Sequence, residues 1–357
     1  MYETPISLSG LIPDRYQLQV EHEGYTSWDR EIEIRAGQTT FADSIVLYPI
    51  DKPTTLFEGN ITTFAQATNG NTAFIEKIDA KTERLVSIRG GEIIELETNI
   101  PTSTATEYTL TFSKDGNTLF WKTTTNKTTS ASLFNISTGE KSVFQTTNTA
   151  CKKIIWNPET TQIICQDDFL DAIAWHETFL VLTRDGSHNT ISTLGNSEIL
   201  ANTPREFEQF CGQTDTILCL TDIRKSTTFL INNKNPENLR ILSFPLTQII
   251  TTTNSEIITA WNNHELYTFY PTTLEYTFIT RISDTITNAL AVAEDHSIIY
   301  TTPNGIFAIE NVPLDDRFVT PLHTDQSISN TIINEERILF IGHSDKSTIG
   351  IMSKKIL

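Results

Sequence analysis

The amino-acid sequence predicts an all-β protein in which a small β-sandwich is followed by a β-propeller. Threonine, isoleucine and phenylalanine, which favour strands, are frequent, and asparagine and glycine separate the short apolar runs. Apolar segments recur at intervals of about 40 to 46 residues, which is the length of a four-stranded propeller blade. The sequence has no long apolar stripe with helical spacing.

The first 50 residues have the pattern of a small sandwich. Apolar and polar residues alternate over residues 16–20 and again over residues 32–34, as in strands with one buried face. Gly24 and Gly37 mark turns, and residues 45–47 are expected to form a last strand. We expect three or four short strands, and the aromatic residues of their core are Tyr16, Tyr25 and Trp28.

The same residues resemble a known family in order and spacing. The positions that resemble the PEGA domain, a small sandwich of bacterial and archaeal envelope proteins, are Leu11, Pro13, Tyr16, Val20, Gly24, Tyr25, Trp28 and Gly37. One departure is Asp14, which stands where the family has Gly, but Asp also tolerates the left-handed region. The resemblance implies an extracytoplasmic location in the cell envelope.

A second departure concerns the first strand of the family, which carries its Pro-Glu-Gly-Ala phrase. The sequence has no counterpart of this strand before Thr4 and Pro5. Because a sandwich without it would leave an unpaired edge, we hypothesise that Met1 is not the natural start. In relatives with this layout a single transmembrane segment lies upstream, so the resemblance implies membrane anchoring through such a segment. An in-frame stop codon directly before Met1 would contradict this hypothesis.

Residues 51–357 repeat one unit of strand, turn, apolar strand, loop, strand, turn and strand. The turns that anchor the repeat contain Asn69-Gly70-Asn71, Asp115-Gly116-Asn117, Thr214-Asp215, Asn254-Ser255, Glu294-Asp295 and Asn334-Glu335. In the gap between the second and third turns, Asn157-Pro158-Glu159 and His176-Glu177 compete as anchors. Four strands per unit favour a propeller over a loose solenoid or two stacked sandwiches.

Two further features support a closed propeller. Residues 112–117 read Phe-Ser-Lys-Asp-Gly-Asn and resemble the Ser-x-Asp-Gly phrase of TolB-like and WD40-like propellers. Residues 54–60 contain a strand without a blade, whereas the last unit ends one strand short, so we expect this strand to complete the last blade. We count seven blades, with residues 157–173 as an insertion or abbreviated unit, and eight is the alternative. The expected domains are therefore 1–50 and 51–357.

The sequence offers no catalytic residues. It lacks a Gly-x-Ser-x-Gly elbow, a His-Glu-x-x-His helix, a phosphate-binding loop and a calcium-loop pattern. The histidines are scattered, and most of them fall at predicted turns; they are His22, His176, His188, His264, His296, His323 and His343. The densest polar cluster comprises Asp167, Asp168 and Asp171, near His176. This cluster is a candidate calcium site, and a solvated loop is the alternative. We assign no cofactor.

The four cysteines form two candidate disulfides. Cys151 and Cys165 flank the turn at Asn157, and Cys211 and Cys219 flank the turn at Thr214. Hairpin pairing would bring each pair onto neighbouring strands. An even number of cysteines suits an oxidising, extracytoplasmic setting, but buried free thiols are an equal alternative.

The formal net charge of −18 disfavours nucleic acid and anionic membrane surfaces as partners. The lack of catalytic signatures and the upstream anchor that the resemblance implies favour a monomeric, non-catalytic envelope protein whose propeller binds a protein or a glycan. The first alternative is a propeller lyase or hydrolase that acts on glycans, with sugar rings stacked on Trp121, Trp156, Trp175 and Trp261. The second alternative is a periplasmic assembly factor similar to TolB.

Overall fold

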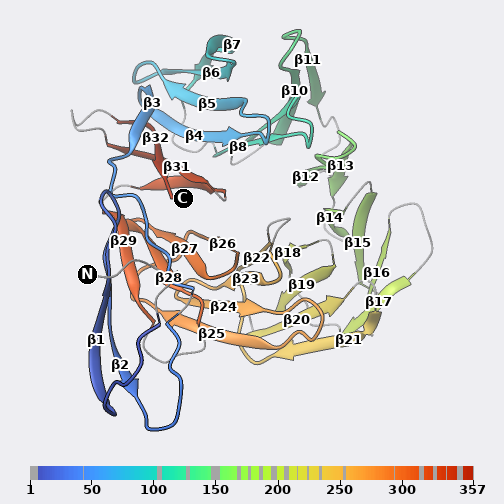
Figure 1. Cartoon of the computed structure of the whole chain (residues 1–357). Coiled ribbons are helices and arrows are strands. Elements are labelled where there is room, and N and C mark those ends of the chain that lie inside the picture. Colours follow the sequence, from blue (N-terminus) through green and yellow to red (C-terminus); the bar gives the residue numbers. More distant parts are fainter. Residues whose placement is uncertain are drawn as a thin grey trace.

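The structure is a computed structural model of the chain (Figure 1). It describes residues 7–42, 44–102, 107–125, 129–145, 153–166, 170–175, 178–184, 188–193, 199–204, 209–214, 216–222, 225–232, 235–251, 255–292, 294–312, 317–324, 328–334, 336–343 and 349–356. All elements assigned in these residues are strands, which confirms the all-β fold class. Within them, no helix has the length and apolar character required to cross a bilayer.

The described strands beyond residue 53 form antiparallel sheets that follow one another around a ring (Figure 1). The first two sheets consist of β4 (Ile61–Gln66), β5 (Thr72–Lys77), β6 (Thr82–Arg89), β7 (Glu92–Pro101); β8 (Glu107–Phe112), β9 (Thr118–Thr124), β10 (Thr129–Asn135), β11 (Lys141–Gln145). A sheet of two strands follows, β12 (Lys153–Trp156) and β13 (Ile163–Gln166).

The ring continues with four-stranded sheets. These consist of β14 (Leu170–Trp175), β15 (Thr178–Arg184), β16 (His188–Thr193), β17 (Ile199–Pro204); β18 (Gln209–Gln213), β19 (Ile217–Asp222), β20 (Thr227–Asn232), β21 (Asn235–Leu242); β22 (Gln248–Ile250), β23 (Ile258–Trp261), β24 (Glu265–Phe269), β25 (Tyr276–Arg281); β26 (Asn288–Val292), β27 (Ser297–Thr302), β28 (Gly305–Glu310), β29 (Val319–Thr324).

The last sheet joins the two ends of the ring, as the sequence predicts. It contains β30 (Ser329–Ile333), β31 (Arg337–His343), β32 (Ile349–Lys355) and, at its outer edge, β3 (Thr54–Glu58). β3 pairs antiparallel with β32, from Thr54 opposite Ser353 to Glu58 opposite Gly350. On the inner side, β30 contacts β4 of the first sheet. The expected closing strand at residues 54–60 is therefore confirmed, and it removes the open edges of the ring.

The predicted anchor turns each lead from the first to the second strand of a sheet. The second strands that follow the anchors are β5, β9, β19, β23, β27 and β31. All residues of β19, β23 and β27 are buried, because sheets cover both of their faces and further strands cover both of their edges. The core accordingly lies between neighbouring sheets, for example as the cluster of Ile75, Leu85, Trp121 and Phe134.

The irregular middle of the chain forms the two-stranded sheet. In the described residues the ring has seven sheets of four strands and this eighth sheet of two strands. The sheet spans Lys153 to Gln166, whereas the sequence places the abbreviated unit at residues 157–173. The difference arises because β14 already begins at Leu170 and belongs to the next sheet.

The N-terminal region differs from the expected sandwich. Its described residues form one hairpin, in which β1 (Asp14–Val20) pairs with β2 (Trp28–Ile34). Residues 45–47 form no strand. Pro49 makes an isolated bridge with Tyr25, and because proline has no backbone N–H, a continuous ladder cannot extend through it.

The segment after the hairpin packs on the propeller instead of completing a sandwich. Val46 and Tyr48 join a core cluster that also contains Phe340 and Met352. Lys354 fixes the chain further on, because its Nζ donates to the carbonyl oxygen of Pro49 at 2.8 Å and to that of Asp51. Burial lowers the pKa of the Lys354 ammonium.

Candidate functional site

The predicted metal cluster falls outside the part of the chain that the structure describes. This applies to Asp167, Asp168 and His176, while Asp171 lies in β14 without a described side chain. Among the described residues, no group of three or more His, Cys, Asp or Glu side chains is arranged to hold a metal ion. The calcium site therefore stays a prediction.

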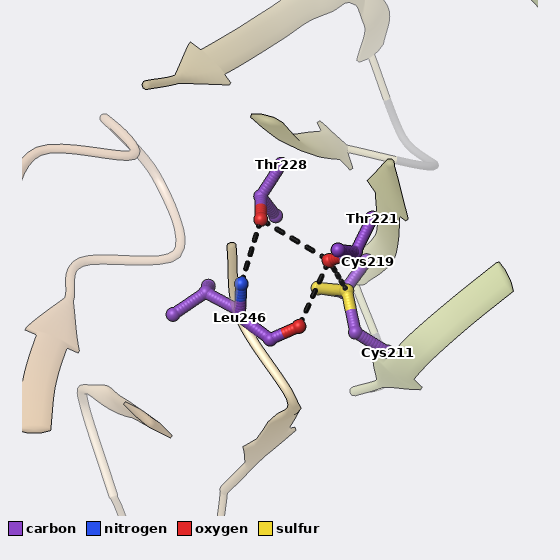
Figure 2. Close-up of a disulfide and its surroundings, with 5 residues drawn as sticks. All are labelled: Cys211, Cys219, Thr221, Thr228 and Leu246. Atoms are coloured by element: carbon purple, nitrogen blue, oxygen red, sulfur yellow. Dashed lines mark hydrogen bonds between the residues drawn. A yellow bond between two sulfur atoms is a disulfide. The ribbon is translucent and has the colours of Figure 1, made fainter. Parts of the chain in front are cut away.

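Cys211 and Cys219 form a disulfide (Figure 2), with Cα atoms 5.1 Å apart. They lie on the paired strands β18 and β19, where the register shifts between Phe210 and Gly212. Cys211 is therefore the extra residue of a β-bulge, which turns its side chain toward Cys219. Cys151 lies outside the described residues, and Cys165 lies in β13 without a described side chain.

A buried ring of hydrogen bonds lies beside this disulfide (Figure 2). The backbone N–H of Leu246 donates to Thr228 Oγ1 at 2.8 Å, and Thr221 Oγ1 donates to the carbonyl oxygen of Leu246 at 2.9 Å. The two hydroxyl oxygens are 3.1 Å apart, so Thr228 can donate to Thr221 and complete the ring. Because Leu246 leads into the next sheet, the disulfide and this ring stabilise the junction between two blades.

The tryptophans proposed as sugar platforms are core residues wherever the structure describes their side chains. Trp121, Trp156 and Trp261 are 8%, 7% and 2% exposed. Trp156 stacks on Phe120 with ring centroids 5.1 Å apart, and Trp121 packs against Phe134. These side chains have too little exposed surface to accept a sugar ring. The side chain of Trp175 lies outside the described residues.

Exposed aromatic rings occur elsewhere, on the outer half of the sheet β22–β25. Phe244 stacks on Tyr267 with ring centroids 4.4 Å apart, and Tyr276 forms a T-shaped pair with Phe244 with centroids 5.4 Å apart. Phe278 packs on Tyr267 at 5.6 Å. Tyr276 and Phe278 are 41% and 47% exposed, so their outer ring surfaces are open to solvent. We call Phe244, Tyr267, Tyr276 and Phe278 the aromatic surface.

Polar groups border the aromatic surface on one side. Glu265 Oε2 accepts hydrogen bonds from the hydroxyl of Tyr267 and from Nδ2 of Asn262, each at 2.8 Å. The Asn262 bond is the main cause that lowers the pKa of Glu265, which therefore stays ionised. Burial and the nearby carboxylate raise the pKa of Tyr267. Arg281 Nη1 lies 3.9 Å from Glu265 Oε1 and adds a positive charge at the same border.

The residues of the aromatic surface are not among the sites predicted from the sequence, although a signal is present. Tyr276 and Phe278 alternate across Thr277 on the outermost strand of a blade, so both point to one face. Large aromatic residues on an outer strand can be flagged from the sequence alone. Phe244 cannot be identified in this way, because it lies between two blades and joins the aromatic surface by stacking on Tyr267.

The junction between the hairpin and the propeller is closed. Trp28 Nε1 donates to Glu310 Oε1 at 2.5 Å, and Arg30 Nη2 forms an ion pair with Glu310 Oε2 at 2.6 Å. The cavity lined by Trp28, Tyr48, His296 and Glu310 has a volume of about 10 Å³ for the centre of a water molecule, which is about the minimum needed to hold one. The junction therefore holds the hairpin in place and leaves no room for a larger ligand.

Comparisons with known proteins agree with the N-terminal resemblance and the fold. The family model of the PEGA domain matches residues 3–45. A chain of the structure described as "Crystal Structure of Mitotic Checkpoint Complex" is similar to this chain with a TM-score of 0.51 at 8% identity, covering 90% of this chain and 97% of that one. At this identity the likeness shows the fold alone.

A second structure, described as "Streptogramin B lyase structure", has a TM-score of 0.48 at 15% identity. The match covers 84% of this chain and 96% of that one. A search of curated proteins found no match.

Proposed function

We propose that the chain is a non-catalytic protein of the cell envelope whose propeller binds glycans through the aromatic surface. The observation that carries this proposal is the arrangement of Tyr276 and Phe278, which expose flat ring surfaces beside ordered polar groups. Sugars combine apolar C–H faces with hydroxyl groups, so a binding site for them needs both features.

Each part of the surface has a separate task in this proposal. The exposed rings of Tyr276 and Phe278 pack against the apolar face of a sugar. Glu265 and Arg281 hydrogen-bond to its hydroxyl groups from the border. Because Phe244 and Tyr267 pack behind these rings, the rings are ordered before a ligand arrives, and binding costs less conformational entropy.

The location in the envelope is supported by the PEGA match at residues 3–45. In this proposal the hairpin holds the propeller in a fixed orientation, since Glu310 and Lys354 both bond the N-terminal region to the ring. We further propose that an upstream anchor attaches the protein to the membrane, and that it acts as a monomer.

Glycan-array binding of the intact chain tests the proposal. The variant Tyr276→Ala should lose at least about tenfold in affinity for the bound glycan, which corresponds to about 1.4 kcal/mol, and Phe278→Ala should do the same. The matched control is Val319→Ala, because Val319 is also 41% exposed and also lies on the outer strand of a blade. The glycan affinity of the Val319→Ala variant should stay within about twofold of that of the unchanged protein.

Other outcomes would favour the alternatives. Turnover of a glycan by the intact chain would support the lyase or hydrolase alternative. If no glycan on the array binds and a protein partner is found whose binding requires Tyr276, the aromatic surface is a binding site for a protein and not for a glycan. Equal losses in Tyr276→Ala and Val319→Ala would exclude the aromatic surface as the site.

A further inference from the structure

The two-stranded sheet differs from the other sheets of the ring in one respect that bears on binding. Figure 1 shows β12 and β13 between the sheets β8–β11 and β14–β17. No described strand pairs with the outer side of β13. Only residues 167–169 separate β13 from β14, and three residues are too few to turn back and form a third strand.

The register identifies the backbone groups on this outer side. The N–H of Asn157 donates to the carbonyl oxygen of Gln162 at 2.9 Å, which marks this pair as hydrogen-bonded. Hydrogen-bonded pairs alternate in antiparallel sheets, so Ile164 and Gln166 also bond to β12. The N–H and C=O groups of Ile163 and Cys165 therefore point to the outer side of β13.

The described side chains of β13 are less buried than those of two second strands that have an outer partner. The second strands β19 and β27 are buried at every residue, but Ile163 and Ile164 of β13 are only half-buried. The strand contains no charged residue and no proline, the residues that usually protect an exposed edge. An unprotected apolar edge of this kind is suited to pair with another strand.

Apolar side chains lie beside this edge. The cluster of Phe120, Ala131, Ile154 and Trp156 has three half-buried members at its border, which are Leu133, Phe144 and Ile163. Leu133 and Phe144 belong to β10 and β11 of the preceding blade. A strand added along β13 could cover these side chains with its own alternate apolar residues.

We propose that β13 binds an extended segment of a partner protein, which adds as the third strand of this sheet. Its backbone pairs with Ile163 and Cys165, and its alternate apolar side chains pack toward Leu133 and Phe144. The net charge of −18 favours a segment whose remaining positions are basic. This peptide site is separate from the aromatic surface and does not depend on it.

Selection from a phage library of ten-residue peptides on the intact chain tests the proposal. We expect enriched sequences that alternate apolar with basic residues, and the synthetic form of the best sequence should bind. Ile163→Pro removes the outward N–H and leaves the bonds to β12, so this peptide should bind at least tenfold more weakly.

The matched control is Val143→Pro, on the exposed outer edge of the complete sheet β8–β11. The bond from the N–H of Asn135 to the carbonyl oxygen of Glu140 places the backbone of Val143 on the outward side as well. Affinity should stay within twofold in this variant. An equal loss in both variants, or no loss in Ile163→Pro, would overturn the proposal.

Hydrogen exchange on the unchanged protein decides the question if Ile163→Pro does not fold. The amides of Ile163 and Cys165 should exchange at least tenfold more slowly once the peptide is bound. Unchanged exchange at both amides would overturn the proposal. Self-association that Ile163→Pro abolishes would also overturn it, because a second copy of the chain would then occupy the edge.

Discussion

Glu310 is the residue that joins the N-terminal hairpin to the propeller. Its carboxylate accepts bonds from Trp28 Nε1 and Arg30 Nη2 of the hairpin and from the backbone N–H of Phe318, the last at 3.0 Å. The side chains of Arg30 and Glu310 are only 19% and 15% exposed, so solvent screens their ion pair weakly. Removing one partner leaves the other charge poorly solvated.

We therefore expect Glu310→Gln to destabilise the attachment of the hairpin by about 2 kcal/mol. Limited proteolysis should cleave residues 35–42 faster in this variant, and thermal unfolding should report the loss of stability. The control is Glu31→Gln, which removes the exposed ion pair with Arg15 and should cost less than about 0.5 kcal/mol. Equal effects of the two substitutions would contradict the role of Glu310.

Tyr48 makes the same junction sensitive to alkaline pH. Burial, with a smaller contribution from the Glu310 carboxylate, raises the pKa of Tyr48 to about 12, although a hydrogen bond to Ser297 opposes the shift. The unfolded chain ionises this group near pH 10. The contribution of Tyr48 to the free energy of unfolding is therefore complete below about pH 10 and is lost by about pH 12. A shift of two units corresponds to about 2 to 3 kcal/mol.

The prediction for Tyr48 is a fall in the free energy of unfolding between about pH 10 and pH 12. In Tyr48→Phe, which cannot ionise, the fall should be smaller by about 2 kcal/mol. Part of the fall should remain, because burial also raises the pKa of Tyr300 to about 12. Denaturant titrations at a series of pH values measure the difference, and identical slopes would refute it.

At the scale of elements, the turn between β8 and β9 shows what the Ser-x-Asp-Gly phrase does. Asp115 accepts bonds from the hydroxyl of Ser113 at 2.6 Å and from the backbone N–H of Asn117 at 3.0 Å, and the Ser113 bond is the main cause that lowers its pKa. Asn69 and Asn71 of the preceding turn donate to the carbonyl oxygens of Asp115 and Gly116. The phrase therefore orders one turn, and the two asparagines attach this turn to the preceding blade.

The disulfide between β18 and β19 leads to the prediction at this scale. Cys211 and Cys219 are separated by 8 residues, and closing a loop of this size should stabilise the chain by about 2 to 3 kcal/mol. The double variant Cys211→Ala and Cys219→Ala should lose about that amount in denaturant unfolding. Peptide mapping after alkylation of the unfolded, unreduced chain should find both residues unmodified. Labelling of all four cysteines would contradict the disulfide.

At the scale of the whole molecule, closure of the ring depends on the pairing of β3 with β32. Gly350 lies opposite Glu58, and a Cβ atom at this position would overlap the backbone carbonyl oxygen of Phe57. The backbone of Phe57 cannot move aside without breaking the pairing of β3 with β32. A side chain at position 350 would therefore weaken the closure of the ring.

We expect Gly350→Ala to destabilise the protein by about 2 kcal/mol, because it separates β3 from β32. Gly342 is its cross-strand neighbour in β31, and a Cβ atom there would meet the ring of Phe340 and no backbone atom of another strand. Gly342→Ala should therefore cost less. Thermal unfolding compares the two variants, and a larger loss in Gly342→Ala would contradict the explanation.

The features predicted from the sequence are those with local or periodic signals. Alternation and turn residues placed the second strands of the blades, and the unmatched strand at residues 54–60 identified the closure. The expected strand at residues 45–47 was wrong, because Val46 and Tyr48 pack on the propeller. The sequence could not show this, since the partners of these side chains lie more than 240 residues away.

The sequence by itself determined that the chain is all-β, that its unit is a four-stranded blade and that an N-terminal strand closes the ring. These properties follow from side-chain alternation and turn chemistry, which act within a few residues. Only the tertiary structure decided that Glu310 holds the hairpin, that Phe244 supports Tyr276 and that no described strand pairs with the outer side of β13. Each of these depends on which distant surfaces meet, and that is settled by packing of the whole ring.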